Sequence, residues 1–250
     1  ITTILPSIIA VCGVNVSTLT NPCYYYYVAA TGTWSARKNC ASVADYRNNW
    51  VKMVDHPSDK TAAMITHSSN SDLTQVQRWT GSSWGNVCVL TENYKSDSYR
   101  SSDLAYERVR GNLMAVYQDD ADTAWDQDPQ YRYFDGTTWS DQASIVCGGG
   151  DEPTFIRLAA KPGGDELVMV YCDESEDAFA AVWNGTTQTW GNVVALTTAT
   201  GTTTAECIAV AYESLTGRCL VFYSEDDTEP RYRIWDGANW GAETLALDTG

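Results

Sequence analysis

The feature of this sequence that most restricts its fold is a repeated turn that ends in tryptophan. Tryptophan closes this turn at positions 34, 84, 139, 190 and 240, so successive turns lie 50, 55, 51 and 50 residues apart. Four turns have closely related sequences, and a fifth is weaker: Arg78–Trp84, Tyr133–Trp139, Val182–Trp190, Ile234–Trp240 and Ala30–Trp34. A fixed period of about 50 residues is typical of repeat architectures built from one small unit of secondary structure. Five such periods account for all 250 residues.

Each period is predicted to form four antiparallel strands. The first two strands are apolar, as in Phe155–Ala159 and Leu167–Tyr171, and a turn that contains Gly and Pro lies between them. The third strand alternates, as in Tyr131–Phe134, and an Asp-Gly or Asn-Gly turn then leads to the fourth strand. Four strands in each period of roughly 40–50 residues predict a β-propeller, because one such sheet can bury its faces only against neighbouring sheets.

We therefore predict an all-β chain that forms a single β-propeller domain over residues 1–250, with about five four-stranded antiparallel blades. The approximate blades are 1–41, 42–91, 92–147, 148–199 and 200–250. The first blade fits the template loosely, with Ile1–Leu5, Ile8–Val14 and Cys23–Ala29 as its first three strands. The alternative for this segment is an N-terminal tail followed by two strands. A β-sandwich with accidental similarity between its turns would not explain the regular spacing of the tryptophans.

The blade sequences resemble those of the fungal fucose-specific lectins. The resemblance rests on Val116–Asp120 followed by Tyr131–Gly136. The turns at Asp135–Trp139 and Asp236–Trp240 also resemble a contracted Asp-box of the sialidase-type propellers, without its Ser-x-Asp-x-Gly spacing. The resemblance covers four of the five periods. It implies a six-bladed propeller with sugar sites formed between blades by an arginine, a glutamate and an aromatic residue. Because five periods are present and no period has these three residues in a fixed place, sugar specificity is not carried over.

The charge of the chain restricts the kind of partner that it can bind. It contains 32 Asp and Glu against 16 Lys and Arg, which gives a net charge of −16. Such a chain lacks the basic patches that bind nucleic acid, and anionic membrane surfaces would repel it. It contains no unbroken apolar run of about 18 residues, so no membrane span is predicted. Because the first residue is Ile, we interpret the chain as a processed product or as an excerpt of a longer protein.

Acidic residues gather in the loops that join the second and third strands of the last three blades. The topology places these loops on the same face as the connections between blades. The predicted ligand-binding residues lie in the first of these loops: Asp119, Asp120, Asp122, Trp125, Asp126 and Asp128. Trp125 lies outside the repeat pattern and is the aromatic residue expected to contact a ligand. The acidic face continues in the other two loops with Asp173, Glu174, Glu176, Asp177, Glu225, Asp226 and Asp227.

This acidic face has three interpretations. Charged loops keep a chain that is rich in Trp and Tyr soluble, so the face could be no more than solvated surface. Clustered carboxylates also suit a calcium ion as a cofactor, at Asp119, Asp120 and Asp122. This loop, however, lacks the Gly and Glu of an EF-hand. The third interpretation is a docking surface for a basic partner or for a further copy of the chain.

The eight cysteines and two glycosylation sequons favour an oxidising, extracellular compartment. The wide spacing of the cysteines argues against a zinc site. Alignment of two repeats places Cys172 and Cys207 on the same face of adjacent blades, where a disulfide would join the blades. Cys12 and Cys23 flank a loop and could face each other across two strands. The alternative is that these residues are free thiols. The sequons are at Asn15 and Asn184.

These observations predict a non-catalytic module that is extracellular or at the cell surface. It would bind a glycan or a protein partner, or form part of a surface or filamentous assembly, with self-association through the hydrophobic start of the chain. No catalytic residue is predicted, because His56 lies in a turn, His67 ends a strand, and Gly148–Gly150 precedes no helix that could bind phosphate. The alternative is a glycan-active hydrolase of the propeller class.

Overall fold

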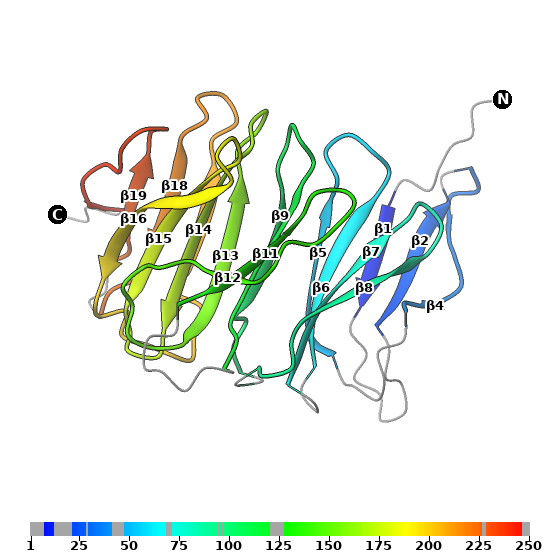
Figure 1. Cartoon of the computed structure of the whole chain (residues 1–250), viewed down its shortest axis with the longest axis horizontal. Helices are drawn as coiled ribbons and strands as arrows, with labels where there is room; N and C mark the ends of the chain where they lie inside the picture. Colours follow the sequence, from blue (N-terminus) through cyan, green and yellow to red (C-terminus); the bar gives the residue numbers. More distant parts are fainter. Residues whose placement is uncertain are drawn as a thin grey trace. The chain divides into compact units, whose positions relative to one another are not determined.

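The computed structural model describes residues 8–12, 22–28, 30–41, 48–68, 72–94, 96, 98–120, 128–226 and 229–246. In these ranges the regular secondary structure consists of strands, and no helix occurs. A membrane-spanning helix is accordingly not found in them. The strands form five four-stranded antiparallel sheets (Figure 1). This confirms the predicted all-β class and the number of sheets, and it is consistent with a β-propeller.

The chain divides into two compact units, which are described separately. The first comprises Ile1–Met53 and Lys60–Asp97, and the second comprises Val54–Asp59 and Ser98–Gly250. The first unit holds two of the sheets and the second unit holds three. The prediction of a single domain over residues 1–250 stays a prediction.

In the first sheet of the first unit, β2 (Cys23–Val28) is the central strand. It pairs with β1 (Ile8–Cys12) on one side and with two short strands, β3 (Thr33–Trp34) and β4 (Lys38–Asn39), on the other. The strands predicted at 8–14 and 23–29 are therefore present with slightly different ends. The strand predicted at Ile1–Leu5 lies outside the described residues.

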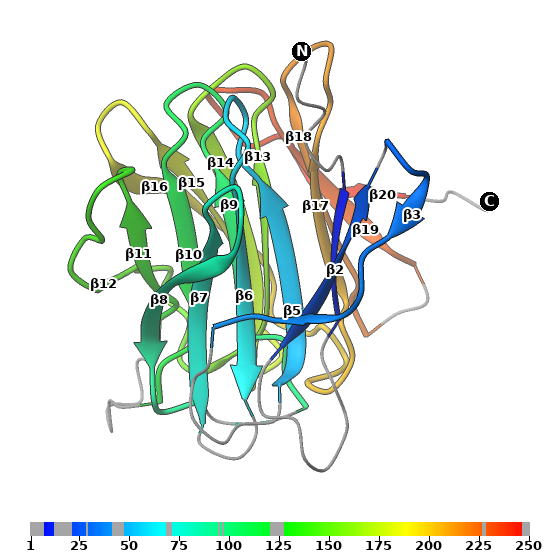
Figure 2. The same ribbon diagram turned by 90° about the vertical axis from the view of Figure 1, so that its right-hand side faces the viewer.

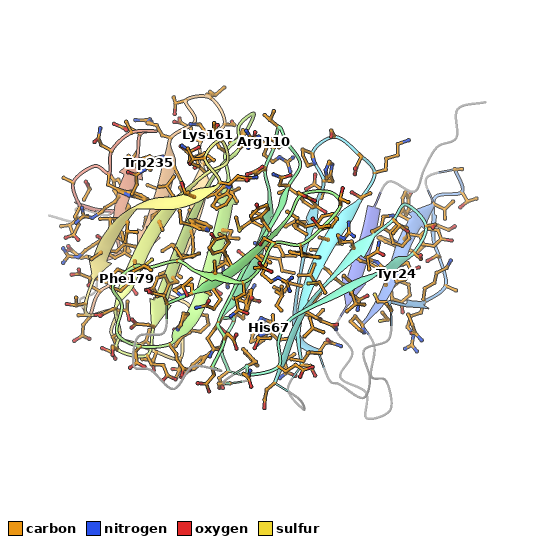
Figure 3. All side chains as sticks on the ribbon, in the orientation of Figure 1. Tyr24, His67, Arg110, Lys161, Phe179 and Trp235 are labelled. Atoms are coloured by element: carbon orange, nitrogen blue, oxygen red, sulfur yellow. The ribbon has the colours of Figure 1, made fainter. Side chains whose placement is uncertain are left out.

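The second sheet of the first unit has its four strands in chain order. They are β5 (Asn48–Asp55), β6 (Ala62–Ser68), β7 (Leu73–Trp79) and β8 (Trp84–Thr91). The first sheet packs against it through Tyr24, whose ring meets Trp79 edge to face with 5.4 Å between centroids. His67 of β6 is buried beside Tyr94 at 4.4 Å (Figure 3). It lies next to the last residue of β6, as expected, and its side chain is part of the core.

The three sheets of the second unit follow one another along the chain, each with its strands in chain order. The first has β9 (Ser102–Tyr106), β10 (Leu113–Tyr117), β11 (Gln130–Phe134) and β12 (Ala143–Ser144). The middle sheet has β13 (Pro153–Ala160), β14 (Glu166–Asp173), β15 (Ala178–Asn184) and β16 (Thr189–Thr197). The last has β17 (Ile208–Tyr212), β18 (Cys219–Tyr223), β19 (Arg231–Trp235) and β20 (Thr244–Leu245). The first strands β9, β13 and β17 lie next to one another in that order (Figure 2).

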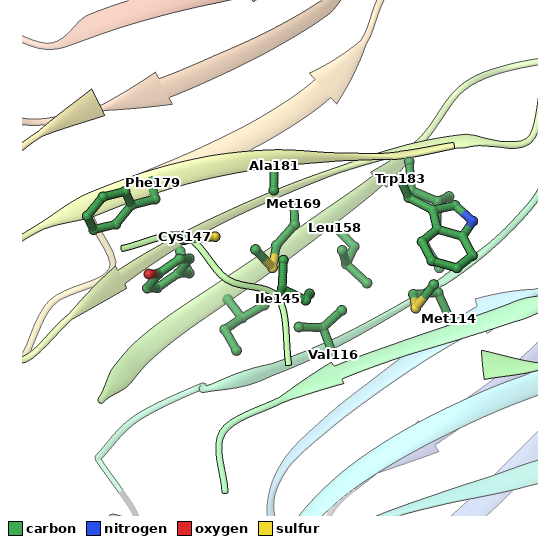
Figure 4. Close-up of a cluster of buried hydrophobic side chains, with 13 residues drawn as sticks. Met114, Val116, Ile145, Cys147, Leu158, Met169, Phe179, Ala181 and Trp183 are labelled. Carbon is green, nitrogen blue, oxygen red and sulfur yellow. The ribbon is translucent and has the colours of Figure 1, made fainter. Parts of the chain in front are cut away.

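The core of the second unit consists of two apolar layers between these sheets. One layer lies between the first and middle sheets and runs from Phe179 and Cys147 at one end to Trp183 and Met114 at the other (Figure 4). The second layer lies between the middle and last sheets and contains Val168, Val170 and Val221. Both faces of the middle sheet are therefore buried, which explains the unbroken apolar run that the sequence has at β14.

The repeated turn joins the third strand to the fourth and has the same construction in two sheets. Asp135 Oδ1 accepts hydrogen bonds from the backbone N–H groups of Thr137 and Thr138, both at 2.7 Å. Asp236 makes the equivalent bonds to Ala238 and Asn239 at 2.8 and 2.7 Å. Gly136 and Gly237 directly follow these two aspartates and have φ values of 98° and 100°, a conformation that favours glycine. These hydrogen bonds to the ionised form lower the pKa of both aspartates.

The closing tryptophan of each turn folds back onto the preceding strand. Trp139 and Trp240 form backbone bridges with Phe134 and Trp235. The rings of the second pair lie 5.4 Å apart, and the equivalent Trp183–Trp190 pair lies 5.6 Å apart. The repeated tryptophans therefore pack the start of the fourth strand against the third strand. This role is structural.

Candidate functional site

The acidic loops of the second unit meet the connections between its sheets at one end of the strands. The turn between β14 and β15 is hydrogen-bonded on one side through Glu174 N–H to Glu152 O at 3.1 Å. On the other side, Glu176 O accepts the N–H of Thr200 at 2.9 Å, and Asp226 N–H donates to Ala199 O at 2.8 Å. The structure therefore brings the loops after β14 and β18 to the same end as the segments that link the sheets.

The loop between β10 and β11 is described in part. Asp119 Oδ2 accepts a hydrogen bond from Gln142 Nε2 at 2.8 Å, and Asp120 is exposed. Asp128 is buried, and its Oδ1 accepts the N–H of Cys147 at 2.8 Å. The other predicted residues of this loop, Asp122, Trp125 and Asp126, lie outside the described residues, and so does Asp227 of the last loop.

Two further predicted acids, Glu174 and Glu225, each bind a neighbouring side chain at this end of the strands. Glu174 is half-buried and accepts the Tyr99 hydroxyl at 3.1 Å. Glu225 forms an ion pair with Arg231, with 2.9 Å between Oε2 and Nε. Among the described residues, no three or more His, Cys, Asp or Glu side chains are arranged to hold a metal ion. The calcium prediction includes Asp122 and stays a prediction.

Asp173 differs from the exposed acid that the loop pattern predicts, because its side chain is completely buried. The last residue of β14 turns its Oδ1 back to accept the N–H groups of Ser175 and Asp177 at 3.0 and 2.9 Å. Its Oδ2 is buried, and none of the residues that the structure describes hydrogen-bonds to it. Burial raises the pKa of Asp173 to about 7, and the carboxylates of Asp177 and Asp151 act in the same direction. Asp173 therefore holds a proton well above the pH at which an exposed aspartate loses it.

The Tyr171 side chain is also buried, and it lies close to the Gly148–Gly150 segment, as Asp173 does. Tyr171 and Phe179 stack with their rings 5.5 Å apart. A Cβ atom built on Gly149 would lie 2.6 Å from Tyr171 Oη and 3.2 Å from Asp173 Oδ2. Burial and the nearby Asp128 raise the pKa of Cys147 to about 12, and burial together with the Cys147, Asp128 and Asp173 groups raises that of Tyr171. Both groups stay protonated at neutral pH, which is the opposite of an activated nucleophile.

Sequence reasoning identified the carboxylates of this cluster but missed Tyr171, Cys147 and Gly149. The available signal was the run Gly148–Gly150. Such a run permits a close approach of backbone to side chains as well as the anion binding for which it was considered.

The close approach at Gly149 leads to a prediction. Gly149→Ala should lower the free energy of unfolding by about 1–3 kcal/mol, because the added methyl group must displace the Tyr171 hydroxyl in a packed core. Chemical denaturation monitored by tryptophan fluorescence would measure the change. Gly150→Ala is the matched control, since its added Cβ would lie more than 4 Å from every atom in the described part of the chain. Equal stability of the two variants would contradict the packing described for this site.

The structure also places the asparagine predicted to be glycosylated and the cysteines predicted to form disulfides. Asn184 is exposed in the β15–β16 turn, where its Oδ1 accepts the N–H groups of Thr186 and Thr187, whereas Asn15 lies outside the described residues. Cys172 Sγ and Cys207 Sγ are 4.0 Å apart, as two neighbouring thiols on adjacent sheets. The backbone register places Cys12 opposite Cys23 across β1 and β2. Both disulfides stay predictions.

Comparisons with known proteins give a likeness of fold. No protein-family model matches the chain, and no curated protein matches it. Among solved structures, the chain is similar to the BP39L lectin from Burkholderia pseudomallei, with a TM-score of 0.62 and 10% identity over 96% of this chain and 70% of that one. It is also similar to AofleA from Arthrobotrys oligospora, with a TM-score of 0.53 and 12% identity over 91% of this chain. The NanB sialidase from Streptococcus pneumoniae matches with a TM-score of 0.51 and 10% identity over 89% of this chain.

The chain is shorter than these proteins. It spans 65% of the AofleA chain and 55% of the NanB chain. At such low identities the likeness shows the fold alone. Because a lectin and a sialidase share this fold, it is compatible with both binding and catalysis.

Proposed function

We propose that this chain is a β-propeller module that binds carbohydrate outside the cell and does not act as a catalyst. The observation that carries the proposal is the set of five four-stranded sheets with a common tryptophan turn, together with the likeness to a lectin at a TM-score of 0.62. The acidic end of the second unit is the proposed binding region. Half-buried carboxylates such as Asp119 and Glu174 can accept hydrogen bonds from sugar hydroxyl groups.

The charge of the chain narrows the kind of glycan. A surface rich in carboxylates on a chain of net charge −16 repels anionic ligands and attracts cationic ones. The proposed ligands are therefore neutral sugars or sugars that carry an ammonium group, and glycans with carboxylate or sulfate groups should bind more weakly.

The buried groups of the site support binding over hydrolysis. A glycosidase needs a carboxylic acid with a raised pKa that can reach the glycosidic oxygen. Asp173 has such a pKa, but its side chain is completely buried. Tyr171 and Cys147 remain protonated, so neither is prepared for nucleophilic attack.

A glycan array followed by calorimetry tests this function. We expect binding of neutral or amino glycans, and we expect Asp119→Asn and Glu174→Gln each to weaken it by about tenfold or more, the value of one hydrogen bond to a charged group. Glu213→Gln is the matched control, because Glu213 lies in the β17–β18 turn at the opposite end of the strands. Absence of glycan binding, or a preference for anionic glycans that the two variants do not change, would contradict the proposal. Turnover of chromogenic glycosides would overturn the non-catalytic part.

A further inference from the structure

The β14–β15 turn, residues 174–177, joins the two connections between sheets at the acidic end of the second unit. On one side, Glu174 N–H donates to Glu152 O in the connection before β13. On the other side, Glu176 O accepts the N–H of Thr200 in the connection before β17. A group that fixes this turn therefore also fixes the end of the strands at which glycan binding is proposed.

Asp173, the last residue of β14, is the group that anchors the turn. Its Oδ1 accepts the N–H groups of Ser175 and Asp177 at 3.0 and 2.9 Å. Its side chain is 0% exposed, and its Oδ2 has no hydrogen-bond partner among the residues that the structure describes. A neutral carboxyl group can stay in this place, whereas a charged one lacks the partners that a buried charge needs.

The groups around Asp173 oppose a charge on its carboxyl group. Burial, the carboxylate of Asp177 in the turn and the carboxylate of Asp151 in the connection before β13 raise its pKa to about 7. No basic side chain in the described part of the chain forms an ion pair with it. The other titratable groups at this end of β14 are acids or keep their protons: Glu152, Glu174, Glu176, Asp128, Cys147 and Tyr171.

We infer that Asp173 is a proton switch, which holds the β14–β15 turn on its two connections while it is protonated and releases the turn when it loses the proton. Release breaks the bonds from Oδ1 to the turn and brings the carboxylate into water, where its charge is solvated. Because Glu174 belongs to the turn, opening would weaken glycan binding at the acidic end. This consequence rests on the proposed function, whereas the switch itself does not.

The direction of the switch follows from proton binding in the two states of the turn. The closed turn keeps the proton up to about pH 7, and in the open turn the carboxyl group loses it near the ordinary value of 3.8. Between these values the open turn binds fewer protons, so opening becomes about tenfold more favourable for each pH unit. Above about pH 7 both states are charged, and the opening equilibrium no longer changes. The turn is therefore closed most firmly at acid pH.

Hydrogen exchange of the full chain without glycan, from about pH 5 to about pH 8, tests the switch. After correction for the intrinsic exchange rate, we expect the protection of the Ser175 and Asp177 amides to fall at least about tenfold up to pH 7 and then to level off. Asp173→Asn should remove this fall, because asparagine does not ionise.

The turn after β11 provides the internal control for this experiment. There an exposed aspartate, Asp135, holds the N–H groups of Thr137 and Thr138 through its Oδ1. Its pKa is lowered, because these bonds favour the charged form and burial does not oppose it. Protection of the Thr137 and Thr138 amides should therefore not fall over the same pH range.

Asp151→Asn is the second variant if Asp173→Asn does not fold. It removes one of the two carboxylates that oppose a charge on Asp173, and it keeps an oxygen that can accept the hydroxyl of Ser175. The pKa of Asp173 should then be lower. The fall in protection should accordingly be smaller and should end at a lower pH.

The exchange data decide the switch in either direction. A fall in the wild type that Asp173→Asn removes, or that Asp151→Asn reduces, supports it. Protection that does not change with pH overturns it, and so does an equal fall in the variants or in the turn after β11. Turn amides that exchange as slowly as those of Val168 and Val170 also overturn it, because the turn then opens only when its whole sheet unfolds.

Calorimetry with glycan at about pH 5.5 and about pH 7.5 tests the link between the switch and the binding region. Weaker binding at the higher pH in the wild type, but not in Asp173→Asn, supports the link, and equal binding of the wild type at both values overturns it. Absence of binding at both values contradicts the proposed function, and the exchange data, which need no glycan, still decide the switch.

Discussion

Asp173→Asn should raise the free energy of unfolding at pH 8 by about 2–4 kcal/mol and leave it nearly unchanged at pH 4. Burial raises the pKa of Asp173 in the folded chain to about 7, compared with 3.8 in the ordinary state. Between pH 3.8 and pH 7 the folded chain holds a proton that the unfolded chain has lost, so the stability of the wild type falls as the pH rises across this range. Above pH 7 the carboxylate is charged in both states, and the full cost of burying that charge is present. Asparagine carries no charge and keeps an oxygen that can accept the N–H groups of Ser175 and Asp177.

Urea denaturation of the wild type and the variant across pH 4 to 8 measures this effect. The quantity to follow is the difference between the two proteins, because other carboxylates contribute equally to both curves. Asp135→Asn is the control of opposite sign. The pKa of Asp135 is lowered by the backbone N–H groups of its turn, so this variant should gain no stability as the pH rises. A difference between Asp173→Asn and the wild type that does not depend on pH would show that Asp173 is not protonated in the fold.

Oxidation should join Cys172 to Cys207 and stabilise the second unit by about 2–4 kcal/mol. The two sulfur atoms already lie 4.0 Å apart, on the end of β14 and just before β17. Hydrogen bonding to the Cys172 thiol lowers the pKa of Cys207 to about 7, and Ser224 and Thr200 contribute to the same effect. Cys207 is half-buried, whereas Cys172 is completely buried. The Cys207 thiolate can therefore attack oxidised glutathione, breaking its S–S bond, releasing one glutathione thiolate and forming a mixed disulfide with the other glutathione. The Cys172 thiol then loses its proton, attacks the Cys207 sulfur and releases glutathione as a thiol.

Peptide mapping without reduction after treatment with oxidised glutathione identifies the bond, and thermal unfolding measures its effect. Cys207→Ser is the control and should lose both the cross-link and the increase in melting temperature. Recovery of Cys172 and Cys207 as alkylated thiols, or linked to other cysteines, would contradict the predicted bond.

The repeat made the fold predictable because the same local chemistry is used in each turn. Asp135 and Asp236 cap their turns, a glycine with positive φ follows, and a tryptophan returns to the preceding strand. All of these interactions are between residues close together in the sequence, so the order of residues reveals them. The first sheet was harder to predict because its outer strand is divided into β3 and β4, and because its turn, Ala30–Trp34, is the weakest copy of the repeated motif.

The site was less predictable because burial depends on contacts between distant segments. Asp173 appears in the sequence as one of several acids in a loop. It is buried because its backbone turn directs the carboxylate inward and because Gly149, 24 positions earlier in the chain, allows the backbone to cover it. The closeness of Cys172 and Cys207 could be predicted, since it follows from aligning two repeats. The environment of the thiols could not, because Thr154, Thr200 and Ser224 come from three separate segments.

The short outer strands have a consequence for aggregation. An uncovered strand edge is a template on which other chains can add strands, and long, regular edges are the most hazardous. In two sheets of the second unit, the outer strands β12 and β20 have two residues each, and in the middle sheet the pairing of β15 with the outer strand β16 is interrupted by register shifts. Each edge therefore offers few consecutive backbone groups to an incoming strand. Contact between molecules is in this way directed from the strand edges to the faces of the sheets, where side chains decide which surfaces fit.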